Sequence, residues 1–168
     1  VREPGGTPVG DEIRRVLLDP VMSIVPNAEA LLFMASRAQL VNAVVRPALG
    51  EGTVVLLDRF FLSTYAYQVY GRNLPESQIA AVNRFATGGL VPSLTLLLDL
   101  PLGVGISRAA ARGDHDRMEM SGDAFHSRVT LAFREFAMPE WQSRHPECGP
   151  IVRIDAQGSE DEVSERIW

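Results

Sequence analysis

Apolar residues follow two patterns along the chain, one typical of buried strands and one typical of helices. Thr53–Leu57 and Leu94–Leu98 are continuous β-branched and aliphatic runs, as in strands that are buried on both faces. A shorter run, Ile151–Ile154, predicts a third strand. Elsewhere apolar residues recur three or four positions apart, which indicates helices. Strands that alternate with helices predict an α/β fold, with a parallel sheet covered by helices on both faces.

Capping residues and prolines place the ends of the predicted helices. Thr7 can cap a short helix, and Asn27 is expected to cap a long helix that reaches Leu49. Pro75 begins another helix, which closes at Gly88. Further helices are expected over Pro101–Arg112, over Asp123–Ser143 with a bend at Pro139, and after Ser159, which forms a capping-box pattern with Glu162.

Composition and charge narrow the class of protein. No linker or low-complexity tract divides the chain, so we predict one domain over residues 1–168. Its apolar runs are too short to span a membrane, and Cys148, the only cysteine, allows no intrachain disulfide, so a cytoplasmic location is expected. A net charge of −5 argues against a nucleic-acid-binding protein.

All 16 basic residues are arginine, since the sequence contains no lysine. The guanidinium group gives a planar, bidentate grip on phosphates and carboxylates. A GC-rich genome would produce the same composition, so the count alone does not indicate a function. Its consequence is that no segment of the 168 residues can supply the lysine of a P-loop.

The first candidate for chemistry is Asp58, which follows the aliphatic run Thr53–Leu57 and precedes Arg59. A carboxylate at the end of a buried strand matches the Walker-B pattern, in which it helps to hold Mg²⁺ beside phosphates. Asp99 follows its own aliphatic run equally well, but it precedes Leu-Pro and is expected to cap a helix. The adjacent arginine favours Asp58 as the functional carboxylate.

Two further groups of residues have the spacing of a binding site, and each has a plainer alternative. Phe33 and Arg37 lie four residues apart on one helix face, where a ring could stack on a nucleobase and a guanidinium could donate to its edge. A core phenylalanine beside a solvated arginine has the same spacing. Arg108, Arg112 and Arg117 could close over a polyphosphate, or could form a solvated helix end.

The ordered series of motifs along the whole chain resembles bacterial thymidylate kinase. Each motif alone could arise by chance, whereas the series in this order is specific. The motifs are Arg2-Glu3-Pro4-Gly5-Gly6-Thr7, Glu29–Phe33 with Arg37, Arg46–Leu49, Asp58-Arg59 with Ser63–Gln68, Phe85–Leu90, Pro92–Asp99 and Asp116–Glu119.

The resemblance implies a role for each matched residue. For the acceptor thymidine monophosphate (dTMP), it implies that Phe33 stacks on thymine, that Arg37 and Gln68 contact the base edge beside Thr64, and that Tyr67 packs where a ribose 2′-hydroxyl would lie. It implies that Arg14 and Arg59 hold the acceptor phosphate, with Asp58 near Mg²⁺. It also implies a lid at about residues 112–121, in which Arg108, Arg112 and Arg117 face the ATP phosphates and Arg59, Arg112 and Arg117 act in catalysis with Asp58.

The family's fold is that of P-loop NTPases, and the chain departs from it at its start. Members begin with a strand, a Gly-rich loop ending in Gly-Lys-Ser/Thr, and a helix, roughly 30 residues or more before the Arg-Glu-Pro-Gly-Gly turn. Here Arg2 is the second residue, and the final helix runs to the last residue. We therefore expect a piece of a longer enzyme, open at both ends and inactive by itself.

The resemblance implies transfer of the γ-phosphoryl group of ATP to dTMP, with ATP and Mg²⁺ as cofactors and a homodimer as the assembly. No nucleic-acid or membrane partner is expected. Two alternatives remain open from the sequence: a related kinase for a deoxynucleoside or another nucleoside monophosphate, and a non-catalytic nucleotide-binding protein without a P-loop.

Overall fold

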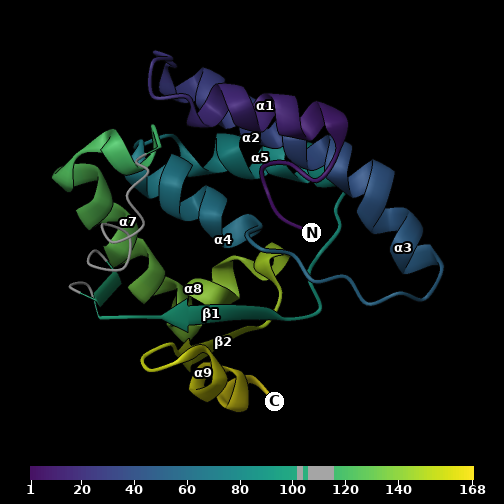
Figure 1. Cartoon of the computed structure of the whole chain (residues 1–168), viewed down its shortest axis with the longest axis vertical. Helices are drawn as coiled ribbons and strands as arrows, with labels where there is room; N and C mark the ends of the chain where they lie inside the picture. Colours follow the sequence, from purple (N-terminus) through teal and green to yellow (C-terminus); the bar gives the residue numbers. More distant parts are fainter. Residues whose placement is uncertain (102–103, 106–115) are drawn as a thin grey trace. The chain divides into compact units, whose positions relative to one another are not determined.

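Helices form most of the described chain, and they accompany a small parallel sheet (Figure 1). The structure is a computed structural model that describes residues 1–101, 104–105 and 116–168. The chain divides into two units, one made of Val1–Leu90 with His115–Val129 and the other of Val91–Asp114 with Thr130–Trp168. Helices with a parallel sheet agree with the α/β class predicted from the sequence. The prediction of a single domain stays a prediction.

The first unit is built on one long helical stretch. Helix α2 (Pro26–Leu40) continues through a π-helical turn, η1 (Val41–Val45), into α3 (Arg46–Gly50). The predicted long helix is therefore confirmed, but Asn27 does not cap it. The cap is Val25, because the following proline, which has no N–H to satisfy, occupies the first helical position.

The 25 residues from Pro26 to Gly50 are long enough and apolar enough to cross a membrane by composition. Core helices of soluble proteins meet the same criterion, and 44% of the apolar window is buried inside the structure. This helix also carries Glu29 and Arg37, both buried. Buried charges with protein partners are typical of a helix that packs in a protein core.

Two helices pack against α2 within this unit. Helix α1 (Pro8–Leu18) begins as predicted, because the Thr7 hydroxyl accepts a hydrogen bond of 3.0 Å from the backbone N–H of Gly10. Its buried Leu17 is completely excluded from solvent. Helix α5 (Glu76–Thr87) ends at Gly88 in the left-handed conformation, also as predicted.

A helical segment that the sequence pattern does not assign follows Asp58. It consists of α4 (Phe61–Thr64) and a second π-helical turn, η2 (Tyr65–Gly71). Phe61 and Tyr65 are buried one turn apart, and they anchor the segment in the core of the unit. The segment carries the motif Ser63–Gln68, so it positions several candidate site residues.

The predicted strand Thr53–Leu57 is wrong for this structure. These residues are irregular, and among the described residues the only ladder contact beside them is an isolated parallel bridge between Arg2 and Asp58. Val54 is 84% exposed and Leu56 is 74% exposed. An aliphatic run becomes a strand only when neighbouring strands satisfy its backbone, and the described residues supply a single bridge.

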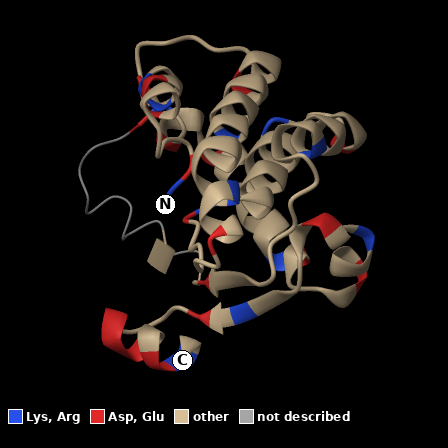
Figure 2. Cartoon of the chain, turned by 90° about the vertical axis from the view of Figure 1, so that its right-hand side faces the viewer, with Lys and Arg blue, Asp and Glu red and all other residues tan. Residues whose placement is uncertain are grey.

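The second unit contains the sheet. Strands β1 (Thr95–Asp99) and β2 (Ile151–Asp155) pair in parallel with Thr95 opposite Ile151, which confirms two of the predicted strands. Leu98 is 53% exposed, so burial of β1 on both faces is not found. Helix α9 (Glu160–Ile167) begins with the predicted capping box and gathers acidic residues in its first turn (Figure 2).

The predicted helix Asp123–Ser143 is two helices. Helix α7 (Asp123–Phe136) ends before Pro139, which begins α8 (Pro139–Arg144) instead of bending one continuous helix. The 3₁₀ turns η3 (Glu119–Ser121) and η4 (Pro146–Cys148) precede α7 and follow α8. The predicted helix Pro101–Arg112 lies mostly outside the described residues.

Candidate functional site

Arginines from separate segments of the first unit lie near one another. Arg14 is on α1, and Arg59 is in the turn before α4. The Arg14 guanidinium donates a 2.9 Å hydrogen bond to the carbonyl oxygen of Pro4. Burial lowers the pKa of Arg14, and the positive charges of Arg2 and Arg59 lower it further, against the opposite effect of the Asp116 and Asp11 carboxylates. We call Arg2, Arg14 and Arg59 the arginine cluster. Neighbouring positive charges repel one another, and a bound anion relieves that repulsion, so the cluster suits a phosphate.

Arg59 is held over an aromatic ring on η2. Its guanidinium carbon lies 5.5 Å from the ring centroid of Tyr67, and its Nη1 is 3.5 Å from the hydroxyl oxygens of Tyr67 and Ser63. Desolvation lowers the pKa of Arg59, but Tyr67, Asp58 and Asp116 raise it by more. The backbone of Arg59 has φ of 70°, a conformation that is uncommon outside glycine and often marks a functional site.

Asp58 presents the carboxylate that the sequence predicts for Mg²⁺. Its side chain is exposed, and its backbone bridges Arg2. Among the described residues, no group of three or more His, Cys, Asp or Glu side chains could hold a metal ion by itself. Mg²⁺ in kinase sites typically takes one or two carboxylates with substrate phosphates and water, and an exposed aspartate beside an arginine cluster fits that donor set.

Arg37 uses all of its donors inside the protein. Its Nε and Nη2 donate to Glu3 Oε2 at 2.8 and 2.6 Å, and Nη1 donates to Thr64 Oγ1 and Asn83 Oδ1, both at 2.7 Å. Nη2 also donates to the carbonyl oxygen of Phe60 at 3.1 Å. A guanidinium has five N–H donors, so none remains for a base unless one of these bonds is exchanged.

The neighbours of Arg37 in the predicted base site are only partly accessible. Thr64 is 2% exposed, and its hydroxyl already accepts a bond from Arg37. Phe33, one helical turn before Arg37, is half-buried. Tyr67 is also half-buried, and its ring centroid lies 6.0 Å from that of Phe125.

A buried carboxylate joins two other predicted site residues. Glu29 is 0% exposed, and it lies on α2. Its Oε1 accepts from Gln68 Nε2 at 3.2 Å and from Arg72 Nε at 3.0 Å, while its Oε2 is 2.8 Å from both Arg72 Nη2 and Arg117 Nη1. We call Glu29, Gln68, Arg72 and Arg117 the Glu29 cluster.

The predicted lid is described only in part. Arg108 and Arg112 lie outside the described residues. Arg117, which the sequence predicts to face ATP phosphates, is instead paired with Glu29, and its Nε donates to the carbonyl oxygen of Leu17 at 2.7 Å. Arg117 therefore has an internal ion pair in this arrangement, and any contact with ATP would require it to move.

Several residues in these clusters were not predicted from the sequence, chiefly Glu29, Glu3, Asn83 and Arg72. Glu29 had a usable signal, because it is the one acidic residue in the apolar stretch Ala28–Met34. A lone charge in an apolar helix segment usually needs a buried partner. The pairing of Asn83 with Arg37 joins positions 46 residues apart and left no signal in the local pattern.

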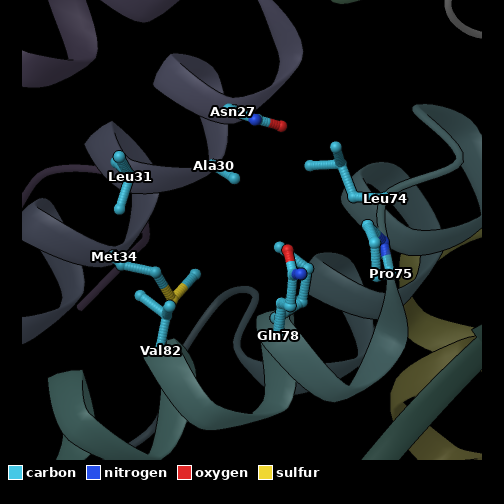
Figure 3. Close-up of a pocket in the computed structure, with 9 residues that line it drawn as sticks. Asn27, Ala30, Leu31, Met34, Leu74, Pro75, Gln78 and Val82 are labelled. Atoms are coloured by element: carbon cyan, nitrogen blue, oxygen red, sulfur yellow. The ribbon is translucent and has the colours of Figure 1, made fainter.

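Two cavities in the described part of the chain are lined by residues other than the predicted site residues. One, of about 180 Å³, lies between α2 and α5 and is lined mainly by apolar side chains such as Leu31, Met34 and Val82, together with the polar Asn27 and Gln78 (Figure 3). Another, of about 600 Å³, lies beside α9 in the second unit. The candidate site is therefore defined by charged and aromatic side chains.

Comparisons with known proteins decide the family. The model of the thymidylate kinase family matches residues 1–167. The chain belongs to the thymidylate kinase family. It is 46% identical to the thymidylate kinase of Deinococcus radiodurans over 167 residues, which cover 99% of the chain and 78% of that relative. It is 50% identical to the thymidylate kinase of a Synechococcus strain, JA-2-3B'a(2-13), over 169 residues, which cover 99% of the chain and 76% of that relative.

The thymidylate kinase of Pseudomonas fluorescens Pf0-1 is 53% identical over 156 residues, which cover 92% of the chain and 71% of the relative. Membership confirms the resemblance drawn from the ordered motifs, because the match extends over nearly the whole chain. The roles of individual residues rest on the geometry of the arginine cluster and the Glu29 cluster, and they remain predictions.

Proposed function

We propose that the protein transfers the γ-phosphoryl group of ATP to dTMP and so produces thymidine diphosphate. Membership of the thymidylate kinase family supports this reaction. The structural observation that carries the proposal is the arginine cluster, in which Arg14 and Arg59 come from separate segments, the charge of Arg59 acts on Arg14, and the Asp58 carboxylate acts on Arg59. Such a group of cations next to a metal-binding carboxylate suits phosphoryl transfer.

The arginine cluster is the proposed site of the acceptor phosphate. The acceptor phosphate is itself the nucleophile and is ionised near neutral pH, so the reaction needs no strong general base. Arg14 and Arg59 would hold the phosphate in line with the donor and offset the repulsion between the two anions. The contact between Arg59 and Tyr67 supports a position of the nucleoside end of the acceptor beside η2.

The proposed base site lies on α2 and η2. Phe33 would stack on thymine, Tyr67 would pack against the sugar, and Gln68 would contact the base edge. Arg37 and Thr64 are bonded to each other, so we assign them first to the support of this wall. A direct bond from Arg37 to the base requires exchange of one of its five internal bonds.

The donor side of the reaction is proposed on fewer observations. Asp58 would hold Mg²⁺, which would offset the negative charge of the phosphates. Arg117, with Arg108 and Arg112 from outside the described residues, would contact the ATP phosphates. The homodimer and the cytoplasmic location stay predictions.

A panel of acceptors tests the proposed function. The full-length protein is supplied with ATP, Mg²⁺ and, in turn, dTMP, dUMP, dCMP, dGMP and thymidine, and nucleotide products are separated by chromatography. We expect the highest kcat/KM with dTMP. Preference for thymidine would support the deoxynucleoside kinase alternative, and a lack of transfer to every acceptor would support a non-catalytic nucleotide-binding protein.

A further inference from the structure

The carboxylate of Glu29, which can only accept hydrogen bonds, contacts the side-chain amide of Gln68 in the proposed base site. Gln68 is 2% exposed, and its Nε2 donates to Glu29 Oε1. Because an ionised carboxylate has no proton to donate, only the NH₂ end of the Gln68 amide can face it. The reversed amide would place two acceptor oxygens against each other inside the protein.

Glu29 is held in its ionised form by its other partners. Burial alone would raise the pKa of this carboxyl, but the hydrogen bonds and positive charges of Arg72 and Arg117 bring its pKa below the ordinary value. Arg72 bonds both oxygens and Arg117 pairs with Oε2, so a cation remains on the carboxylate when Arg72 alone is replaced. In this arrangement the group that faces Gln68 is therefore an acceptor near neutral pH.

With Nε2 committed to Glu29, the other end of the Gln68 amide is the carbonyl oxygen Oε1. The described residues supply no bond to Oε1, whereas they do supply one to Nε2. We propose that Glu29 is a positioning residue that orients Gln68 so that it offers a hydrogen-bond acceptor to the base of the acceptor nucleotide. This inference rests on the proposed function, which places Gln68 at the base edge.

The orientation has a consequence for base selection. Thymine and uracil carry a hydrogen at N3 and can donate to Oε1, whereas cytosine presents a lone pair at N3 and would oppose it. A site with a fixed hydrogen-bonding group rejects a base with the wrong pattern strongly, because a buried polar group is left unpaired. Glu29 would thus act on specificity through Gln68, without contact with the nucleotide.

The test compares dissociation constants of dTMP and dCMP, measured by calorimetry on the full-length protein. In Glu29→Gln, residue 29 can both donate and accept, so the Gln68 amide is free to reverse. We expect the preference for dTMP over dCMP to fall at least about tenfold. The matched control is Arg72→Gln, which weakens the Glu29 cluster but leaves the Glu29 carboxylate facing Gln68. The preference of this variant for dTMP over dCMP should stay within about twofold of that of the unaltered protein.

The outcomes separate the two proposals. Loss of preference in Glu29→Gln with its retention in Arg72→Gln supports the positioning role. An unchanged preference in Glu29→Gln, or equal losses in both variants, would overturn that role while leaving the kinase proposal intact. If the unaltered protein binds no dTMP, the proposed function fails and the inference with it.

Glu29→Gln leaves two arginines without their counter-ion, so its folding is checked by thermal unfolding. If it does not fold, Gln68→Met serves instead, because this variant removes the amide and keeps the ion pairs. The preference for dTMP over dCMP should then fall by the same factor. A Gln68→Met protein that retains the preference would show that Gln68 does not select the base.

Discussion

At the scale of single residues, Arg37 has the sequence spacing of a base contact, while its hydrogen-bond donors are engaged inside the protein. The sequence places it one turn after Phe33, a spacing that suits a base contact. In the structure it is 3% exposed and forms a buried ion pair with Glu3, which is 5% exposed. Its main partners come from distant segments, so local spacing could not reveal that its donors are used.

Replacement of Arg37 by alanine is expected to destabilise the fold. The change leaves the Glu3 carboxylate buried without its partner, which typically costs about 3–5 kcal/mol in the free energy of unfolding. The matched control is Arg15→Ala, because Arg15 pairs with Glu12 on the exposed face of α1 and should contribute no more than about 1 kcal/mol. Urea unfolding of both variants measures the difference.

Equal stability of the two variants would contradict this assignment of Arg37. If Arg37→Ala lost dTMP affinity but remained as stable as Arg15→Ala, Arg37 would be a direct base contact, as its spacing from Phe33 suggests. The comparison therefore separates support of the site wall from contact with the nucleotide.

At the scale of elements, η2 and the start of α7 meet at a glycine. A Cβ atom added to Gly71 would lie 2.6 Å from Phe125 Cε2 and 3.1 Å from Val129 Cγ2. Arg128 also joins α7 to this glycine, since its Nη2 donates a 2.6 Å hydrogen bond to the carbonyl oxygen of Gly71. The contact fixes the end of the π-helical turn that carries Tyr67 and Gln68.

Alanine at position 71 is expected to strain this contact. Overpacking of a close contact typically costs about 1–3 kcal/mol in unfolding free energy, and a shift of η2 should also weaken dTMP binding. Gly50→Ala is the control, because a Cβ there meets no atom within 4 Å. Thermal unfolding and dTMP titration of both variants check this, and a Gly71→Ala protein as stable as Gly50→Ala would show that the contact relaxes without cost.

The sequence predicted elements well where local chemistry decides them. Thr7, Gly88 and the Ser159 capping box placed helix ends correctly, because each acts on the backbone within a few residues. The aliphatic run Thr53–Leu57 failed as a strand, since strand formation depends on partners elsewhere in the chain. The helical segment Phe61–Gly71 was missed, because its motif was interpreted as chemistry and not as an element.

At the scale of the whole molecule, the order of motifs was more informative than any single motif. Asp58 and Asp99 fit one pattern equally well, yet Asp99 forms an ion pair with Arg153 on the neighbouring strand. The series from Arg2 to Glu119 predicted the family, which the comparisons then confirmed over residues 1–167. The Glu29 cluster could not be predicted in this way, because it depends on contacts between segments 39 or more residues apart.

The central claim is that the arginine cluster binds the acceptor phosphate, and one measurement tests it most directly. Calorimetric titration compares dTMP with thymidine, which differs only by the phosphate, on the unaltered protein and on Arg59→Ala. Loss of one charge-assisted bond should weaken dTMP binding by about 1.5–3 kcal/mol and leave thymidine binding unchanged. Equal weakening of both ligands, or no weakening of either, would contradict the placement of the phosphate at Arg59.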